Sequence, residues 1–381
     1  KLGSLSKNII TIKGFNQKSI INKTMKTMKK NLLALGIILM SALTFTACSD
    51  DDDFYDGKQP EVSTTDVYVS CAGNFGANDG TVGILDYNIQ ARPTAPFLYR
   101  NAYQEQNGIK IGDAQDLIVF GDKVVVACTT SSKIEVLNRV GKVEQTIKLH
   151  NVEPRYLATD GKYVYFSAYS GKVYKMNPND KVKPMVDSVV VGDHPEAISI
   201  TNGKLYANLS NYSMTGNGKY VAVVDLNTFR NPKNIEVGLN PYNQNIAAGN
   251  DVFIVSMFDY VEKPLVQKID TKTNKVTQLF NATSIAYSAQ KNALVCLYAP
   301  YGSNDKSFFL YDLATGQKTN LDMTGLRSPQ QVNVDKWGNI YVIDNPSYNA
   351  PSEVFYYSPE GKLIQGNIIV GMSAQNVRFA N

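Results

Sequence analysis

The chain repeats a unit of about forty residues, and this repeat limits the possible folds more than any other feature. Each unit begins with a short segment that often contains proline and ends in an aliphatic residue. A tight turn with Gly, Asn or Asp follows, then an alternating strand, a polar loop and a second strand that ends in Asp. We expect the equivalent aliphatic positions to be Ile118, Leu157, Ile198, Ile246, Ile285 and Val332. This period, with four short strands per unit, is typical of β-propellers.

The strand assignment follows from alternation and from residue type. The segments Lys162–Phe166 (KYVYF) and Asn339–Ile343 (NIYVI) are rich in β-branched and aromatic residues, which favour strands. Turns such as DGK and WGN stand just before them and supply residues suited to tight hairpins.

The two ends of the repeat region share one unit. The tail SAQNVRFAN repeats the first segment, with Val377 in the aliphatic place, but no hairpin partner follows it. The segment Asp66–Tyr87 has the opposite defect, because it supplies later strands without a first segment. We therefore expect Val377 and Phe379 to lie beside a strand that contains Val67. The sequence predicts an all-β fold, a seven-bladed β-propeller in which the N- and C-terminal segments close one blade and leave no free edge.

A second pattern, MKKNLLALGIILMSALTFTACSDDDD, precedes the repeat. Lys29 and Lys30 are followed by the apolar stretch Leu32–Leu43, which is too short to span a bilayer, and then by small residues and Cys48. This order predicts a secretory signal whose cleavage leaves Cys48 as a lipidated N-terminus. The alternative is an internal apolar helix with an incidental cysteine.

These patterns predict four segments. We expect residues 1–27 to be non-native or to result from an incorrectly assigned start. We expect residues 28–47 to be a lipoprotein signal peptide, residues 48–64 a lipidated acidic linker and residues 65–381 the propeller. Residues 1–47 hold eight lysines and no acidic residue, so their removal leaves 30 Lys and Arg against 34 Asp and Glu, a net charge of −4. Nucleic-acid binding, which needs a basic face, is not expected.

Cysteine and histidine usage argues against a metal centre. Cys71, Cys128 and Cys296 each lie in an apolar strand-like run, so we expect small buried side chains, although their redox state stays open. His150 and His194 are the only histidines, and no C-x-x-C motif occurs, so we expect no structural zinc site.

The sequence contains none of the H-E-x-x-H, G-x-S-x-G or phosphate-loop motifs that mark common enzymes, so we expect a binding protein rather than an enzyme. His194 and Glu196 form the one local pair that a catalytic centre could use.

A propeller places the loops that lead into its inner strands, and those that join second to third strands, on one face. Here these loops are rich in aromatic and amide side chains, which predicts a ligand-binding face, although each tyrosine could instead only cover its own blade. The candidate ligand-binding residues are Asn74, Phe75, Asp113, Gln115, Arg155, Tyr156, Tyr169, His194, Glu196, Tyr212, Tyr242, Asn243, Phe258, Tyr260, Tyr298, Tyr301, Gln330 and Tyr348. The single tryptophan, Trp337, is expected in a turn on the opposite face.

The D-x-x-T turns, the VYV and IYV second strands and the seven units resemble YncE/YVTN-type propellers. With the lipobox and the acidic run after Cys48, the chain is similar to the BtuG-type cobalamin-binding surface lipoproteins. This resemblance implies a protein that is lipid-anchored in the outer membrane and exposed on the cell surface. It would capture a corrinoid, its only bound small molecule, and pass it to a TonB-dependent outer-membrane transporter.

The corrinoid hypothesis gives several candidate residues a role. Gln115, Asn243 and Gln330 could pair with the amides at the edge of the macrocycle, and His194 could approach the cobalt as an imidazole ligand. His194 could equally be a loop residue with local bonds only. Two further readings stay open, a glycan-capture lipoprotein and a protein-interaction propeller without a small ligand.

Overall fold

The computed structural model describes residues 67–210, 218–258, 262–347 and 349–380, and all structural statements below concern this part of the chain. Cys48, the predicted signal peptide and the predicted acidic linker lie outside it. Within the described residues, no helix is both long enough and apolar enough to cross a membrane.

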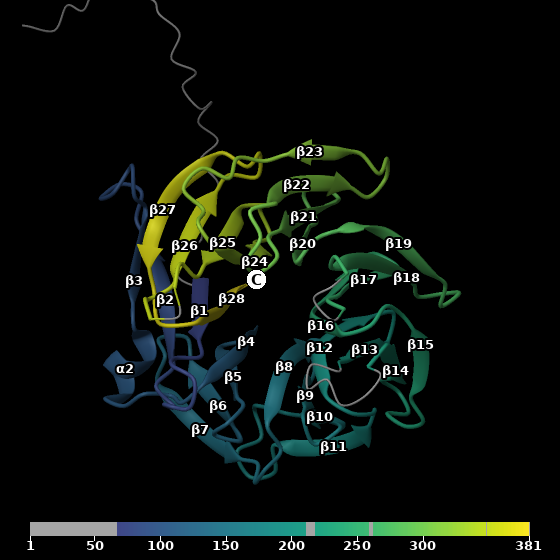
Figure 1. Ribbon diagram of the computed structural model, residues 1–381. Helices are drawn as coiled ribbons and strands as arrows, with labels where there is room; N and C mark the ends of the chain where they lie inside the picture. The colour runs from purple at the N-terminus through teal and green to yellow at the C-terminus, as the bar shows by residue number, and fades with distance from the viewer. Residues whose placement is uncertain (1–66, 211–217, 259–261, 348, 381) are drawn as a thin grey trace, which may run out of the picture. The chain divides into compact units, whose positions relative to one another are not determined.

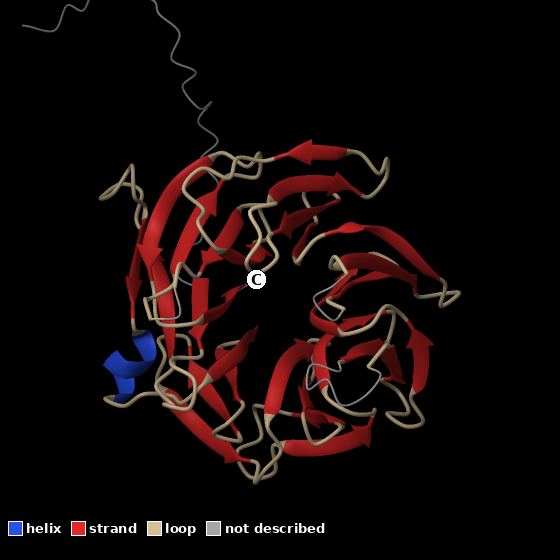
Figure 2. Ribbon diagram, in the orientation of Figure 1, coloured by secondary structure: helices blue, strands red, loops and turns tan. Residues whose placement is uncertain are grey.

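Four-stranded antiparallel sheets follow one another as the blades of a ring (Figure 1; Figure 2). From the centre outward, blade 1 consists of β28 (Ala374–Phe379), β1 (Val67–Cys71), β2 (Thr81–Tyr87) and β3 (Phe97–Arg100). Blade 2 consists of β4 (Ala114–Phe120), β5 (Lys123–Cys128), β6 (Lys133–Asn138) and β7 (Val143–Lys148). Blade 3 consists of β8 (Pro154–Thr159), β9 (Val164–Ala168), β10 (Lys172–Met176) and β11 (Met185–Val190). Blade 4 consists of β12 (Pro195–Thr201), β13 (Lys204–Leu209), β14 (Tyr220–Asp225) and β15 (Lys233–Glu236).

The remaining blades have the same order. Blade 5 consists of β16 (Pro241–Ala248), β17 (Asp251–Ser256), β18 (Leu265–Asp270) and β19 (Val276–Asn281). Blade 6 consists of β20 (Ser284–Ser288), β21 (Ala293–Tyr298), β22 (Ser307–Asp312) and β23 (Lys318–Asn320). Blade 7 consists of β24 (Pro329–Val334), β25 (Ile340–Asp344), β26 (Glu353–Tyr357) and β27 (Leu363–Ile369). A short helix, α2 (Ala102–Asn107), lies between β3 and β4. The predicted seven-bladed β-propeller is confirmed.

Blade 1 is closed as the sequence predicts. Strand β28 pairs antiparallel with β1, with Val377 opposite Val69 and Phe379 opposite Val67. The inner strand of the first blade therefore comes from the far end of the described chain, and the ring has no open sheet edge at this point.

The D-x-x-T motif forms the hairpins between third and fourth strands. In the β18–β19 hairpin, Asp270 Oδ1 accepts hydrogen bonds from the backbone N–H groups of Lys272 and Thr273, both at 2.9 Å. Asp312 does the same in the β22–β23 hairpin, with Ala314 at 2.8 Å and Thr315 at 2.7 Å. The aspartate thus replaces missing backbone acceptors in the turn, which explains why it recurs.

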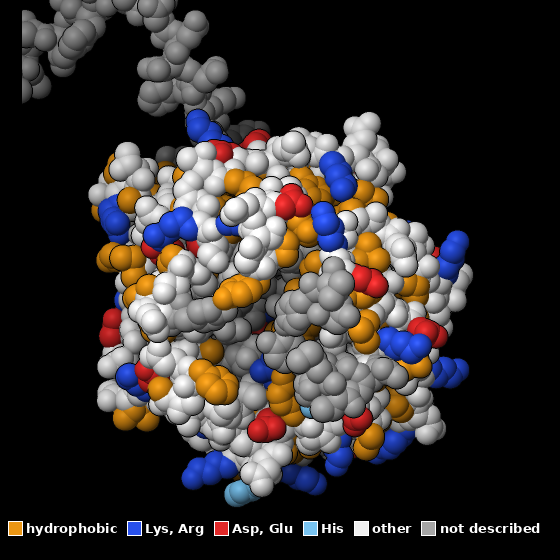
Figure 3. Space-filling view, viewed as in Figure 1, with side chains coloured by type: hydrophobic (Ala, Val, Ile, Leu, Met, Phe, Trp, Pro, Cys, Tyr) orange, Lys and Arg blue, Asp and Glu red, His pale blue; other side chains and the backbone are white. Residues whose placement is uncertain are grey.

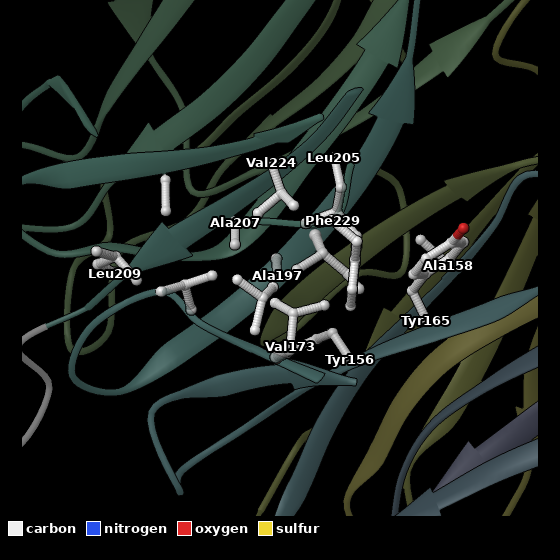
Figure 4. Packing of buried hydrophobic residues seen from close by; sticks show 14 residues of the cluster. Tyr156, Ala158, Tyr165, Val173, Ala197, Leu205, Ala207, Leu209, Val224 and Phe229 are labelled. Carbon is white, nitrogen blue, oxygen red and sulfur yellow. The ribbon is translucent and has the colours of Figure 1, made fainter. Parts of the chain in front are cut away.

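The hydrophobic core is divided among the interfaces between neighbouring blades. Seven clusters of buried apolar residues occur in the described chain. In one of them, Tyr156 and Val173 of blade 3 lie against Ala197 and Leu205 of blade 4 (Figure 4). Each fully buried large apolar side chain contributes roughly 1.5–3 kcal/mol, so every blade depends on both neighbours.

The cysteines belong to this core. Cys71, Cys128 and Cys296 are buried and form no disulfide. The expectation of small buried side chains is confirmed for all three.

Two of the predicted equivalent positions are displaced by one residue. In each of blades 2 to 7, equivalent inner-strand positions can be defined by their partner, which is the residue two places before the end of the second strand. These inner-strand residues are Leu117, Leu157, Ile198, Asn245, Ile285 and Val332. Ile118 and Ile246 were therefore wrongly aligned. The displacement in β16 arises because an asparagine occupies the apolar position. Asn245 Nδ2 donates to the carbonyls of Ala197 and Tyr206 in blade 4, at 3.3 and 3.1 Å.

Candidate functional site

The face formed by the inner-strand approaches and by the loops from second to third strands is called the loop face. Figure 3 shows it, with hydrophobic side chains at the surface and basic side chains mainly toward the rim. A cavity of about 690 Å³ lies here, between blades 5 and 6. We call it the loop pocket. Its wall consists of Asn240, Tyr242, Asn243, Met257, Phe258, Glu262, Lys263, Pro264, Thr283, Tyr298, Ala299, Pro300, Tyr301, Ser303 and Gln330.

Six predicted ligand-binding residues meet in this pocket. They are Tyr242, Asn243, Phe258, Tyr298, Tyr301 and Gln330. They belong to three successive blades. Tyr242, Asn243 and Gln330 lie at the starts of the inner strands β16 and β24 rather than in the loops before them, and Tyr298 ends β21. Phe258 and Tyr301 lie in loops from second to third strands, as predicted. None of the other nine wall residues was predicted, and five of them are polar: Asn240, Glu262, Lys263, Thr283 and Ser303. The signal for these was only their position near predicted residues.

On the blade 5 side of the pocket, two hydrogen bonds join the segment before β16 to the β17–β18 loop. Asn240 Nδ2 donates to the backbone carbonyl of Phe258 at 2.6 Å, and the Phe258 N–H donates to the carbonyl of Leu239 at 3.0 Å. Phe258 has a φ of 55°, in the left-handed region that bulky residues rarely adopt. The two hydrogen bonds hold this strained backbone and fix the half-buried ring of Phe258 at the pocket wall.

The blade 6 side is built around Thr283 and Tyr298. Thr283 Oγ1 donates to the carbonyl of Leu297 at 3.1 Å and accepts from the N–H of Ala299 at 3.0 Å, which fixes the start of the loop. The ammonium of Lys263 lies 5.6 Å from the centre of the Tyr298 ring. Tyr301 lies further along this loop and is 78% exposed, so its ring stands at the surface of the pocket.

The pocket therefore combines apolar ring surfaces with carboxamides. Gln330 is exposed, and its Nε2 lies 3.3 Å from Ser328 Oγ. Asn243 Oδ1 is buried and has no hydrogen-bond partner among the described residues. This composition suits a ligand with a broad apolar surface and polar groups at its edge.

A second group of predicted residues is buried around an ion pair in blades 2 to 4. Arg155 Nε lies 2.9 Å from Glu196 Oε2, and Arg155 Nη1 donates to Gln115 Oε1 at 2.8 Å. Tyr169 donates its hydroxyl to Glu196 Oε1 at 2.6 Å, and Gln115 Nε2 donates to the hydroxyl of Tyr156 at 3.3 Å. Burial raises the pKa of the Glu196 carboxyl, and Arg155 opposes this shift. These side chains satisfy one another, which favours a structural role for the group.

His194 lies beside this group rather than in the loop pocket. Its ring makes an edge-on contact with Tyr169, with 5.4 Å between ring centres, and its φ is 46°. No group of three or more His, Cys, Asp or Glu residues suited to a metal ion occurs in the described residues. The role of His194 as a cobalt ligand stays a prediction.

The other predicted residues are dispersed. Asn74 is tied to Asp79, with its Nδ2 2.9 Å from Oδ2, and the neighbouring Phe75 is fully exposed on the β1–β2 loop. Asp113 accepts from the backbone N–H groups of Thr130 and Ser131, and so holds the β5–β6 loop. Three further predicted residues, Tyr212, Tyr260 and Tyr348, lie outside the described part of the chain.

The inner strands also line a cavity of about 350 Å³, here called the channel cavity. Its polar wall includes Asp116, Asn243, Gln244, Asn245, Gln331, Asn333 and Arg378. Asn243 belongs to the walls of both cavities, so the two adjoin. Except for Asn243, these residues were not among the candidates. The signal that could have found them is the recurrence of polar residues next to the aliphatic positions of the inner segments.

No known family model matches this chain, and no curated protein matches it. Solved structures do match. A quinonprotein alcohol dehydrogenase-like protein from Bacteroides thetaiotaomicron is 14% identical, with a TM-score of 0.58 over 82% of this chain and 78% of that one. Hydrazine synthase from Kuenenia stuttgartiensis is 15% identical, with a TM-score of 0.55 over 70% of this chain and 89% of that one. At such identities the likeness shows the β-propeller fold alone.

Proposed function

We propose that the chain is a lipid-anchored outer-membrane protein that captures a corrinoid at its loop face and passes it to a TonB-dependent transporter. The loop pocket is the observation that carries the proposal, because its wall joins aromatic rings to carboxamides. Such a wall can cover an apolar macrocycle and pair with amides at its edge. The choice of a corrinoid rests on the resemblance to BtuG-type lipoproteins, and the anchor rests on Cys48 and the acidic run that follows it.

The volume of the loop pocket fits part of such a ligand. At about 690 Å³ it falls within the roughly 300–1,000 Å³ of small-molecule sites. A corrinoid is larger, so we place one edge of the macrocycle in the pocket and the rest across the loop face. Tyr301 would then lie against the macrocycle, and Gln330 and Asn243 would meet its amides.

The direct test mixes the protein with cyanocobalamin, passes it through a desalting column and reads the absorbance of the protein fraction. Calorimetry then compares Tyr301→Ala and Gln330→Ala with Trp337→Ala. We expect each pocket variant to bind about tenfold more weakly, a loss of about 1.4 kcal/mol. Trp337 lies in the β24–β25 turn on the opposite face, so its variant should bind like the wild type. Absence of the chromophore from the protein fraction would contradict the proposal.

One observation favours a second candidate, glycan capture. Tyr301 presents an exposed ring on which a sugar could stack, and Asn243 and Gln330 could pair with hydroxyls. Trp337 cannot extend such a platform, because it lies in the β24–β25 turn on the opposite face, where its backbone N–H donates to Asp335 Oδ1. Calorimetry with a panel of oligosaccharides, using the same three variants, separates this candidate from the corrinoid.

A further inference from the structure

A cavity of about 560 Å³ lies on the face opposite the loop face, between blades 3 and 4. We call it the hairpin pocket, because its wall comes mainly from the β8–β9, β12–β13 and β14–β15 hairpins. Its volume falls within the roughly 300–1,000 Å³ of small-molecule sites. The wall consists of Thr159, Asp160, Lys162, Tyr163, Lys175, Ile200, Gly203, Leu226 and Asn227.

The ammonium group of Lys175 is held among three aromatic rings at this pocket. Its nitrogen lies 4.1 Å from the centre of the Tyr163 ring, 5.8 Å from that of Tyr165 and 5.9 Å from that of Phe229. Tyr165 and Phe229 belong to the core between the two blades, so they give the ammonium group a rigid support (Figure 4). Lys175 is half-buried, and its nitrogen forms no hydrogen bond or ion pair with the described residues but stays accessible to solvent.

A second ammonium group lies against the same ring. Lys162 is exposed, and its nitrogen is 5.3 Å from the centre of the Tyr163 ring. Asp160 is the one carboxylate among the described wall residues, and both of its oxygens are already engaged. Its Oδ1 accepts from the backbone N–H groups of Lys162 at 2.9 Å and Tyr163 at 2.7 Å, and its Oδ2 accepts from the Tyr165 hydroxyl at 2.9 Å. The wall therefore has an excess of positive charge.

The charged and apolar parts of the wall together select the class of ligand. A half-buried cation without a counter-ion is costly, and aromatic rings reduce this cost without neutralising the charge. An anion beside the Lys175 nitrogen would form charge-assisted hydrogen bonds there. A phosphate monoester has several oxygens, so it can accept from both ammonium groups. The half-buried side chains of Ile200 and Leu226 leave an apolar surface for the rest of such a molecule.

We propose that the hairpin pocket binds a phosphate monoester with an apolar body. The phosphate oxygens accept from the ammonium groups of Lys175 and Lys162, and the apolar body packs against Ile200 and Leu226. This site uses residues of blades 3 and 4 alone and lies on the face opposite the loop pocket. It therefore does not depend on the proposed capture of a corrinoid.

The first test uses phenyl phosphate as the probe and follows the ring signals of Tyr163. These signals are identified in a carbon–proton NMR spectrum as those lost in Tyr163→Phe. Titration with phenyl phosphate should shift them to saturation, whereas benzyl alcohol, which has a neutral hydroxyl in place of the phosphate, should not shift them. Equal shifts with both compounds, or no shift with either, would overturn the proposal.

The second test removes the charges one at a time. Lys175→Gln and Lys162→Gln should each bind phenyl phosphate about tenfold more weakly, whereas Lys175→Arg, which keeps the charge, should retain most of the affinity. Lys162 is exposed, so its variant tests the charge even if Lys175→Gln does not fold. The matched control is Lys336→Gln, because the Lys336 nitrogen lies 4.6 Å from the centre of the Trp337 ring on the same face but outside the pocket. Wild-type affinity in both pocket variants would overturn the proposal.

A membrane headgroup can present the same phosphate monoester, and the third test separates this source from a free molecule. The Cys48→Ser protein, which cannot be lipidated at this position, is sedimented with phosphatidylcholine vesicles that contain or lack phosphatidic acid. Sedimentation that requires phosphatidic acid and is lost in Lys162→Gln would support the site with a headgroup as its ligand. Shifts with phenyl phosphate but no sedimentation would support the site with a free phosphate ester. The absence of both would overturn the site.

Discussion

Asp116 on β4 and Arg378 on β28 form an ion pair at 3.0 Å across 262 positions of the sequence. The other carboxylate oxygen of Asp116 accepts from the backbone N–H of Leu157 at 3.0 Å, so one side chain connects blades 1, 2 and 3. Asp116 is 1% exposed, and burial raises the pKa of its carboxyl while Arg378 opposes the shift.

Replacing the arginine of this pair should leave a buried carboxylate without its cation. We expect Arg378→Met to lower the free energy of unfolding by about 2 kcal/mol, less than the roughly 3–5 kcal/mol of a fully buried pair, because the Arg378 side chain is 34% exposed. Denaturant unfolding at neutral pH measures this loss. The matched control, Arg230→Met, breaks an exposed pair with Asp187 and should change stability by less than about 1 kcal/mol.

The same variant should respond to pH in a definite direction. A carboxyl whose pKa is raised in the folded state holds its proton while the unfolded chain has lost it, so stability falls as pH rises from the ordinary Asp value to the raised value. The deficit of Arg378→Met should therefore be greatest at neutral pH and shrink on acidification. A deficit that is constant over this range would mean that lost packing, not the buried charge, is responsible.

Removal of residues 373–381 should open the ring, because β1 loses its inner partner and the cluster around Val377 loses its centre. We expect the truncated protein to aggregate or to lose its cooperative thermal transition, as followed by circular dichroism and size-exclusion chromatography. A synthetic peptide of these residues should restore part of the transition, and a peptide of scrambled sequence should not. An unchanged melting temperature would refute the closure.

The D-x-x-T hairpins should contribute to sensitivity to acid. The pKa of Asp270 and the pKa of Asp312 both lie below the ordinary 3.8. The main cause is a backbone hydrogen bond, from the N–H of Thr273 to Asp270 and from the N–H of Thr315 to Asp312. A lowered carboxyl pKa gives stability that is present above the ordinary value and is lost as pH falls through the folded-state pKa. The double variant Asp270→Asn, Asp312→Asn keeps an acceptor oxygen but does not titrate. Its melting temperature should fall less than that of the wild type between about pH 5 and about pH 2.

The three core cysteines should be inert in the native protein. Burial raises the pKa of the Cys71 thiol to about 12 and also raises the pKa of Cys128 and Cys296. Iodoacetamide at neutral pH should label none of them before unfolding and all of them in denaturant, as counted by mass spectrometry in a Cys48→Ser background. Rapid native labelling of any one would show that its blade opens locally.

The predicted anchor is testable in cells. Cys48→Ala should leave the protein unprocessed or release it, because the diacylglycerol thioether cannot form, and fractionation followed by immunoblotting checks this. Replacing Asp50–Asp53 with alanine should retain the lipid but reduce cleavage by protease added to intact cells. Wild-type amounts of Cys48→Ala in the outer membrane would refute the lipidation.

Sequence predicted the blades and their closure because both depend on local signals repeated many times. Each hairpin has its own turn residues, and the tail segment around Val377 has the same pattern as the other inner segments. The alignment failed at β16, where Asn245 takes an apolar position and replaces packing with hydrogen bonds to blade 4. A pattern of aliphatic residues cannot anticipate a buried polar side chain whose partners lie in another blade.

The candidate site was predicted only in part. Sequence placed Tyr301 and Gln330 on one face of the propeller, where the structure has them, but it could not place them in one pocket, because the depth of a cavity depends on how neighbouring blades pack. Arg155 and Glu196 met the same criteria of residue type and position, yet the structure pairs them with each other. A single sequence does not show which charged side chains from different blades become neighbours in the fold. For the same reason, the relation between Asp116 and Arg378 could not be seen.

The pairing of β1 with β28 sets the order of events in biosynthesis. Among the described strands, β1 leaves the ribosome first and β28 last, so blade 1 is the first blade begun and the last completed. Until then the nascent chain carries an exposed strand edge that can recruit a chaperone or another chain. A quality-control system that senses the free inner edge of β1 can distinguish a ring closed by β28 from a chain that stopped before it.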